Sequence, residues 1–137
     1  MTAKYTGGCL CGEARFATDA EPLFTGNCHC KDCQKISGGA YTPAMFFPES
    51  AVTVSGTTKS FRSLGDSGQY IERHFCPNCG SPVVTKLEVL PGMVGLKAGT
   101  LDDPSLYKPA INLYVARAPH WNHMNPDLPK FDTTPPQ

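Results

Sequence analysis

Short apolar stretches, rich in β-branched and aromatic residues, alternate along the chain with Gly, Pro, Ser and Asp. Such stretches are typical of β-strands bounded by turns. The 13 glycines and 13 prolines are spread widely, so the segments between them are too short for long helices. The pattern predicts strands at residues 13–17, 40–47, 52–55, 58–63, 69–75, 82–87 and 93–98. Their close spacing favours antiparallel hairpins.

Helices contribute little to this pattern. One short helix is expected at residues 31–37, where Gly38 and Gly39 end it, and residues 102–106 can form one further turn. Five prolines after residue 118 make the C-terminal tail irregular, and we expect it to lie over the surface and to fray over 132–137. The 137 residues contain no repeat or linker, so they predict one mainly β domain spanning 1–137.

The charges balance, with 12 lysines and arginines against 12 aspartates and glutamates. This balance leaves no overall field to attract nucleic acid or an anionic membrane. The N-terminal sequence lacks the apolar run of a signal peptide, and no stretch reaches the roughly 18 apolar residues of a membrane span. We therefore expect a cytoplasmic protein with a small-molecule partner, no nucleic acid and no membrane.

Seven cysteines lie in three clusters: Cys9 with Cys11, Cys28 with Cys30 and Cys33, and Cys76 with Cys79. In a reducing compartment, this spacing is more typical of metal ligands or redox groups than of structural disulfides. Residues i and i+2 of an extended segment face the same side, so each Cys-x-Cys pair can aim two sulfurs at one point. In the segment CPNCG at 76–80, proline presets the turn and glycine can take a positive φ, which is the pattern of a zinc knuckle.

The number of sulfurs suits two zinc sites of different kinds. A structural zinc site uses four protein ligands, whereas a catalytic site keeps three and leaves one position open. Seven cysteines divide as four plus three, because one Cys-x-Cys pair and the Cys-x-x-Cys pair can supply a closed site. The cluster of Cys28, Cys30 and Cys33 then forms a three-thiolate site whose fourth ligand is exchangeable.

Other uses of the cysteines fit less well. Disulfides are disfavoured by the odd count, the missing export signal and the strain of closing a ring across one residue. A redox dithiol at Cys76 and Cys79 lacks a βαβ setting, and iron–sulfur clusters need sets of four. The strongest alternative has two structural sites, the second completed by His29 or His74. We expect His29 to point away from the sulfurs and His74 to pack beside the knuckle.

Four motifs carry a resemblance to a known family: GCLCG at 8–12, CHCKDC at 28–33, FCPNCG at 75–80 and GTLDDP at 99–104. Over about residues 5–131 the sequence resembles the glutathione-dependent formaldehyde-activating (GFA) family, which shares its domain with centromere protein V. The resemblance implies a β-tent of twisted antiparallel sheets built around two zinc ions per chain. It assigns the structural zinc to Cys9, Cys11, Cys76 and Cys79, and the catalytic zinc to Cys28, Cys30 and Cys33.

The resemblance also implies a reaction. A thiol such as glutathione adds to a small aldehyde, nominally formaldehyde, to give S-hydroxymethylglutathione, which is carbon–sulfur lyase chemistry. A three-thiolate zinc carries a net negative charge, so it suits a bound thiolate better than an attacking hydroxide. Candidates to handle the proton are Asp32, Glu72 and His74. Candidates to bind the glutathione carboxylates are Lys31, Lys35, Arg62 and Arg73.

Two other functions remain open at this point. The first is a non-catalytic, zinc-dependent thiol carrier or protein-interaction module. The second is nucleic-acid binding by analogy with centromere protein V, which the chain's neutral charge and missing basic extension disfavour. The stretch 114–121 is expected to form a strand followed by a packed tail, and a homodimer is compatible with the sequence.

Overall fold

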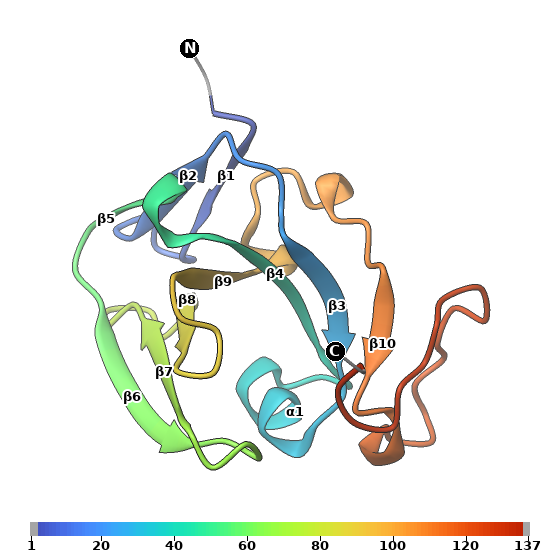
Figure 1. The fold of residues 1–137 in the computed structure, drawn as a ribbon. Coiled ribbons are helices and arrows are strands. Elements are labelled where there is room, and N and C mark those ends of the chain that lie inside the picture. Colours follow the sequence, from blue (N-terminus) through green and yellow to red (C-terminus); the bar gives the residue numbers. More distant parts are fainter. Residues whose placement is uncertain (1–2, 136–137) are drawn as a thin grey trace.

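The computed structural model describes residues 3–135, which form two β-sheets and one short α-helix (Figure 1). The strands are β1 (Tyr5–Gly8), β2 (Arg15–Thr18), β3 (Phe24–Cys28), β4 (Thr42–Pro48), β5 (Thr53–Ser55), β6 (Lys59–Leu64), β7 (Tyr70–Phe75), β8 (Pro82–Leu87), β9 (Met93–Lys97) and β10 (Ile111–Leu113). The helix is α1 (Lys31–Ser37), and the 3-10 turns are η1 (Glu49–Ala51), η2 (Ala98–Thr100), η3 (Pro104–Leu106) and η4 (Val115–Arg117). The predicted mainly β fold class is confirmed. Within residues 3–135, no helix has the length and apolar character to cross a membrane.

The strands divide between a small and a large sheet. The small sheet has the order β1-β2-β5, and the large one has the order β10-β3-β4-β9-β8-β7-β6. Neighbouring strands are antiparallel, as expected, except that β10 runs parallel to β3. A parallel pair needs a long crossover, and the chain supplies one because most of its strands lie between β3 and β10.

The core lies between the two sheets. Tyr5 and Phe16 of the small sheet are buried with Met45, Phe47 and Leu96 of the large sheet, all at most 4% exposed. The rings of Tyr5 and Phe47 meet edge-on, with centroids 5.3 Å apart and planes at 62°. Alternate residues of β4 and β9 supply this apolar face, so burial of one face accounts for the strand pattern in the sequence.

Three strands escape prediction, namely β1, β3 and β10. Glycines in β1 and β3 indicate turns in a sequence, but here they allow close packing. A Cβ at Gly7 would lie 2.3 Å from the Thr100 carbonyl oxygen and 2.5 Å from the Phe16 ring. A Cβ at Gly26 would lie 2.9 Å from the Phe24 ring. Glycine is therefore required where a side chain or another chain segment lies directly against the strand.

The expected strand within 114–121 is wrong. β10 ends at Leu113 because Tyr114 adopts a left-handed conformation with φ 56°, and η4 follows. The tail is packed as expected, because it returns along β10 and donates from Phe131 N to Asn112 O at 3.0 Å. Tyr114 N donates to Thr133 O at 2.9 Å, so the tail is held at least that far. The last two residues of the predicted frayed end, 136–137, lie outside the described residues.

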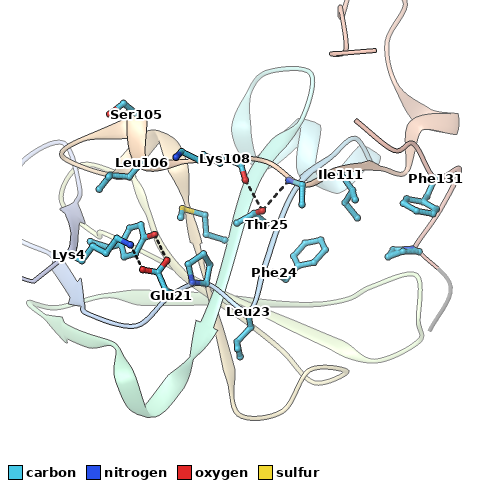
Figure 2. A pocket seen from close by; sticks show the side chains of 15 residues that line it. Lys4, Glu21, Leu23, Phe24, Thr25, Ser105, Leu106, Lys108, Ile111 and Phe131 are labelled. Carbon is cyan, nitrogen blue, oxygen red and sulfur yellow. Dashed lines mark hydrogen bonds and ion pairs between the residues drawn. The ribbon is translucent and has the colours of Figure 1, made fainter. Parts of the chain in front are cut away.

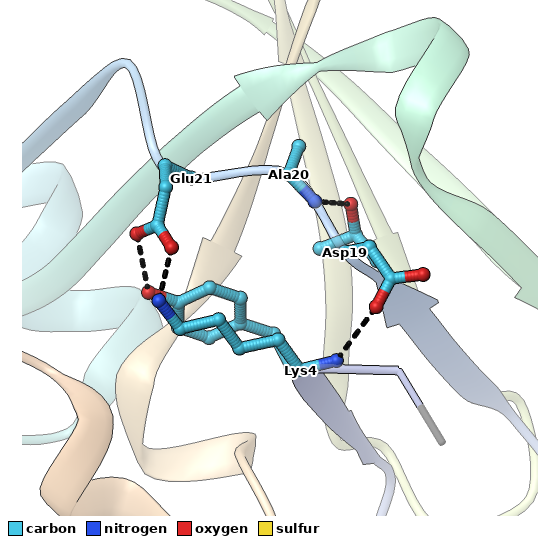
Figure 3. Close-up of polar contacts among 6 residues, drawn as sticks. Lys4, Asp19, Ala20 and Glu21 are labelled. Atoms are coloured by element: carbon cyan, nitrogen blue, oxygen red, sulfur yellow. Dashed lines mark hydrogen bonds and ion pairs between the residues drawn. The ribbon is translucent and has the colours of Figure 1, made fainter. Parts of the chain in front are cut away.

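Polar contacts hold the start of β1 in place. Lys4 N donates to Asp19 Oδ1 at 3.1 Å, Lys4 Nζ pairs with Glu21, and the Tyr5 hydroxyl donates to Glu21 Oε2 at 3.1 Å (Figure 3). Asp102 accepts from the hydroxyl of Thr6, the second residue of β1, at 2.8 Å, and it also pairs with Arg15 of β2. These contacts orient β1 so that the chain leaving it runs toward the end of β7.

Candidate metal centres

The structure gathers the seven cysteines into two separate groups. The tetracysteine group consists of Cys9, Cys11, Cys76 and Cys79. The tricysteine group consists of Cys28, Cys30 and Cys33. In each group all sulfurs lie within 4.8 Å of one another. The division matches the one that the family resemblance implies.

Sulfur distances in the tetracysteine group suit a single metal ion. Cys11 Sγ lies 3.6 Å from Cys9 Sγ and 3.7 Å from Cys76 Sγ. A tetrahedral zinc ion with bonds of ~2.3 Å separates its sulfurs by roughly 3.8 Å. A disulfide would bring two sulfurs to about 2.05 Å, so the spacing fits a zinc site and not a cross-link.

Two tight turns shape this group. Cys9 and Cys11 lie in a turn after β1, not in the extended segment expected, because Gly12 has φ 84° and donates to Cys9 O at 3.1 Å. The other turn is the predicted knuckle, in which Gly80 has φ 78° and donates to Cys76 O at 2.8 Å. Ser81 joins the two turns, since its hydroxyl accepts from Leu10 N at 3.0 Å.

Neighbouring donors favour the thiolate form of two cysteines in the tetracysteine group, Cys9 and Cys79. The Ser81 hydroxyl, 3.3 Å from Cys79 Sγ, lowers the pKa of Cys79 to about 5. The backbone N–H of Ala14, 3.2 Å from Cys9 Sγ, lowers the pKa of Cys9. Hydrogen bonds to the charged form of a thiol favour that form, which is the form that binds zinc.

The tricysteine group lies where β3 gives way to α1, at the end of the sheet near α1 in Figure 1. Cys28 is the last residue of β3, and Cys30 is the extended N-cap of α1. Cys33 lies in the first turn of α1, where its N–H approaches Cys30 Sγ at 3.4 Å. The helix has its predicted bounds and ends at Gly38, which has φ 72°.

The charges of this group call for a cation. The Cys28 and Cys33 thiols beside Cys30 lower the pKa of Cys30 to about 2, while the contact with Cys30 raises the pKa of Cys28. Protons on two sulfurs thus stabilise one thiolate, and three thiolates at this spacing repel one another. The donor set is soft and lies within reach of a single ion, so it suits zinc.

His29 supports the tricysteine group from behind. It is fully buried, and its Nδ1 lies 3.0 Å from Asn27 O and 3.3 Å from Leu113 O. Carbonyls only accept, so Nδ1 donates, and Nε2 accepts from Asn122 Nδ2 at 2.9 Å. His29 points away from the sulfurs, as expected. Gln34 adds a second brace, because its Nε2 donates to His29 O at 2.9 Å.

Two of these supporting residues were not anticipated from the sequence. Asn122 is 93 positions from His29, and no spacing pattern connects them. Gln34 carries no sequence signal beyond its place in a short helix. The C-terminal tail therefore supports the site, because Asn122 holds the imidazole ring of His29, the residue between Cys28 and Cys30.

The expected proton-transfer candidates do not converge on the tricysteine group. His74 Nε2 lies 2.5 Å from Glu72 Oε1, and His74 pairs across the sheet with the core residue Val84. Asp32 is exposed in the first turn of α1. Among residues 3–135, no histidine or carboxylate joins Cys28, Cys30 and Cys33 within ligand distance of all three. The described residues thus leave the fourth position open, and neither His29 nor His74 completes it.

A cavity of about 820 Å³ lies away from both groups (Figure 2). It is lined mainly by apolar residues of β3, β4, η3, β10 and the C-terminal tail, among them Phe24, Leu106 and Ile111. At its edge the hydroxyl of Thr25 donates to Lys108 O at 2.9 Å. No cysteine lines this cavity, so its size does not make it the candidate reaction site.

A mainly β fold with two cysteine groups defines a class of metal-binding domain. Comparison with protein families is more specific, since residues 4–117 match the model of the glutathione-dependent formaldehyde-activating enzyme family. The chain belongs to this family. No curated protein matches the sequence. A crystal structure of a Rhodobacter sphaeroides protein, a structural genomics target, is similar in fold, with 16% identity, a TM-score of 0.58, and coverage of 92% of this chain and 98% of that one.

Proposed function

We propose that this chain is a zinc-dependent enzyme that makes or breaks the carbon–sulfur bond of a thiol–aldehyde adduct, nominally S-hydroxymethylglutathione. The tricysteine group carries the proposal, because its three sulfurs lie together and no further ligand from residues 3–135 joins them. Three protein ligands around zinc leave a position for a substrate. Membership of the family supports the choice of glutathione and formaldehyde as the nominal substrates.

The tetracysteine group is proposed to hold a structural zinc ion. Its four sulfurs satisfy a tetrahedral ion completely, so no position is left for a substrate. Cys9 and Cys76 are part of the apolar core, so the site is continuous with the packing between the sheets. Structural zinc contributes on the order of 10–16 kcal/mol of apparent binding energy in small domains, comparable to the stability of a whole domain.

The proposed reaction balances without a further reactant. The thiol gives up its proton, and the sulfur lone pair attacks the aldehyde carbon. The carbon–sulfur bond forms, and the carbonyl oxygen takes up a proton to become a hydroxyl group. The reverse reaction breaks the same bond. Bound in the tricysteine group, zinc would hold the incoming sulfur as a thiolate and position it for attack.

The chain's own residues prepare this site. Cys28, Cys30 and Cys33 provide electron-rich sulfur, and the Cys33 N–H fixes the orientation of Cys30. His29 and its partners hold the backbone between the ligands. Because neither Glu72 nor His74 joins the tricysteine group, the proton is proposed to exchange with solvent, to which all three cysteines are partly exposed.

The test is cleavage of S-hydroxymethylglutathione by zinc-loaded protein, followed as formaldehyde release above the spontaneous rate. Cys30→Ser is the matched variant, because a serine oxygen can still cap α1 while the thiolate is lost. We expect acceleration by the wild type and none by the variant. Thiol binding without acceleration would identify a carrier and refute the enzyme proposal.

A further inference from the structure

One face of the large sheet connects the tricysteine group to a pair of basic residues. Cys28 pairs with Thr42 across β3 and β4, so both side chains lie on the same face. Ala44, two residues along β4, shares this face and pairs with Lys97 of β9. Lys97 therefore lies on the Cys28 side of the sheet, away from the apolar core.

The same face continues to Arg73. Gly95, two residues before Lys97, pairs with Thr85 of β8, and Thr85 pairs with Arg73 of β7. Lys97, Thr85 and Arg73 thus follow one another across three adjacent strands. Strand register, and not sequence distance, brings these three residues together. The sequence therefore indicated Arg73 only as one of several candidates and gave no indication of Lys97.

A cavity of about 210 Å³ lies over these residues. Lys97, Arg73 and Thr85 line it together with Phe61 of β6 and Ile36 of α1. Ile36 follows Cys33 by three residues in α1, so the two share a face of the helix. We call this space the cationic cavity, and its α1 wall leads to the tricysteine group.

Within the part of the chain that the structure describes, each cation of the cationic cavity contacts a hydroxyl group and no carboxylate. Lys97 Nζ contacts Thr85 Oγ1 at 3.4 Å, and Arg73 Nη1 donates to Ser63 Oγ at 3.1 Å. Among residues 3–135 neither cation forms an ion pair. Burial is the main cause that lowers the pKa of Lys97, and the neighbouring positive charge of Arg73 lowers it further. Two half-buried positive charges side by side favour binding of an anion between them.

We propose that the cationic cavity binds a carboxylate of the thiol substrate, with Lys97 and Arg73 as its charged partners and Thr85 as a hydroxyl donor. This inference rests on the proposed function, because it places the carboxylate beside the sulfur site. Pockets for whole drug-sized ligands have about 300–1,000 Å³. With about 210 Å³, the cavity accommodates one carboxylate end of glutathione or a smaller carboxylated thiol.

The test measures binding to the zinc-loaded full chain by calorimetry. S-methylglutathione carries the carboxylates but no free thiol, and its diethyl ester carries neither. We expect the wild type to bind S-methylglutathione more tightly than the ester, and Lys97→Met to weaken binding of S-methylglutathione by about tenfold or more without affecting the ester. Arg73→Gln provides a second variant with the same expected loss.

The matched control is Lys86→Met, because Lys86 is an exposed lysine of the neighbouring strand β8 that already pairs with Glu49 at 2.8 Å. The inference is overturned if the wild type does not distinguish the two probes, or if Lys86→Met weakens binding as much as Lys97→Met. Binding of 2-mercaptoethanol, which has no carboxylate, tests the sulfur site separately. If it fails to bind the wild type, the proposed function is at fault and not the cationic cavity.

Discussion

Cys79 provides the sharpest test of the difference between the two cysteine groups. It belongs to the tetracysteine group, which joins the turn after β1 to the turn after β7. Cys33 belongs to the tricysteine group, whose members all lie in one short segment. Both residues are half-buried, so Cys79→Ala and Cys33→Ala remove the same atoms from similar surroundings. The two variants should differ mainly in which loop is no longer closed by metal.

The expected difference follows from the lengths of the loops. Cys11 and Cys76 are 65 residues apart, whereas Cys28 and Cys33 are 5 apart. Closing a loop of n residues lowers the conformational entropy of the unfolded chain, which raises the free energy of unfolding by about (3/2)RT ln n. The longer loop therefore contributes about 2 kcal/mol more stability than the shorter one. For a domain of this size, this corresponds to a difference of roughly 5–15 °C in melting temperature.

The assay is thermal unfolding by circular dichroism in the presence of zinc, with the metal content of each variant measured in parallel. Each variant should lose about one zinc ion, and Cys79→Ala should melt at the lower temperature. Melting of the two variants within 2 °C of each other, with one ion lost from each, would refute the assignment of a structural role to the tetracysteine group alone.

Three further predictions test other parts of the structure. Gly56→Ala should lower the melting temperature more than Gly12→Ala, because both glycines have positive φ but only a Cβ at Gly56 would lie 2.0 Å from a backbone oxygen; equal losses would contradict this. The pKa of Asp102 is lowered to about 2 by its arginine partner, so its contribution is present above pH ~4 and lost toward pH 2. The stability gap between wild type and Asp102→Asn should therefore shrink over that range, and a constant gap would be evidence against the ion pair. Asn122→Ala leaves His29 Nε2 without its partner and should cost about 1–3 kcal/mol in urea denaturation, whereas no loss would mean that water replaces the amide.

Local signals explain what the sequence predicted well. The bounds of α1 follow from Cys30 at its N-cap and Gly38 at its end, and both signals lie within a few residues of the helix. The knuckle at 76–80 likewise depends on Pro77 and on Gly80, whose φ is positive as expected. The division of the cysteines came from motif resemblance, and the spacing of the sulfurs in the structure agrees with it.

The features that escaped prediction depend on contacts between distant residues. The glycines of β1 and β3 resemble turn signals in the sequence, and only the structure shows that Thr100 lies against Gly7 and Ile111 against Gly26. The placement of Lys97 between Cys28 and Arg73 depends on the register of five strands, which alternation of apolar residues does not specify. The brace from Asn122 to His29 requires the tail to fold back, and nothing in its proline-rich sequence indicates where it docks.

The most direct test of the two-site account is the zinc content of the purified protein compared with that of Cys30→Ser. The account predicts two ions per folded wild-type chain and one in the variant, with the fold retained. One ion in the wild type, or loss of both ions on changing Cys30, would contradict a closed structural site that is independent of an open reactive one.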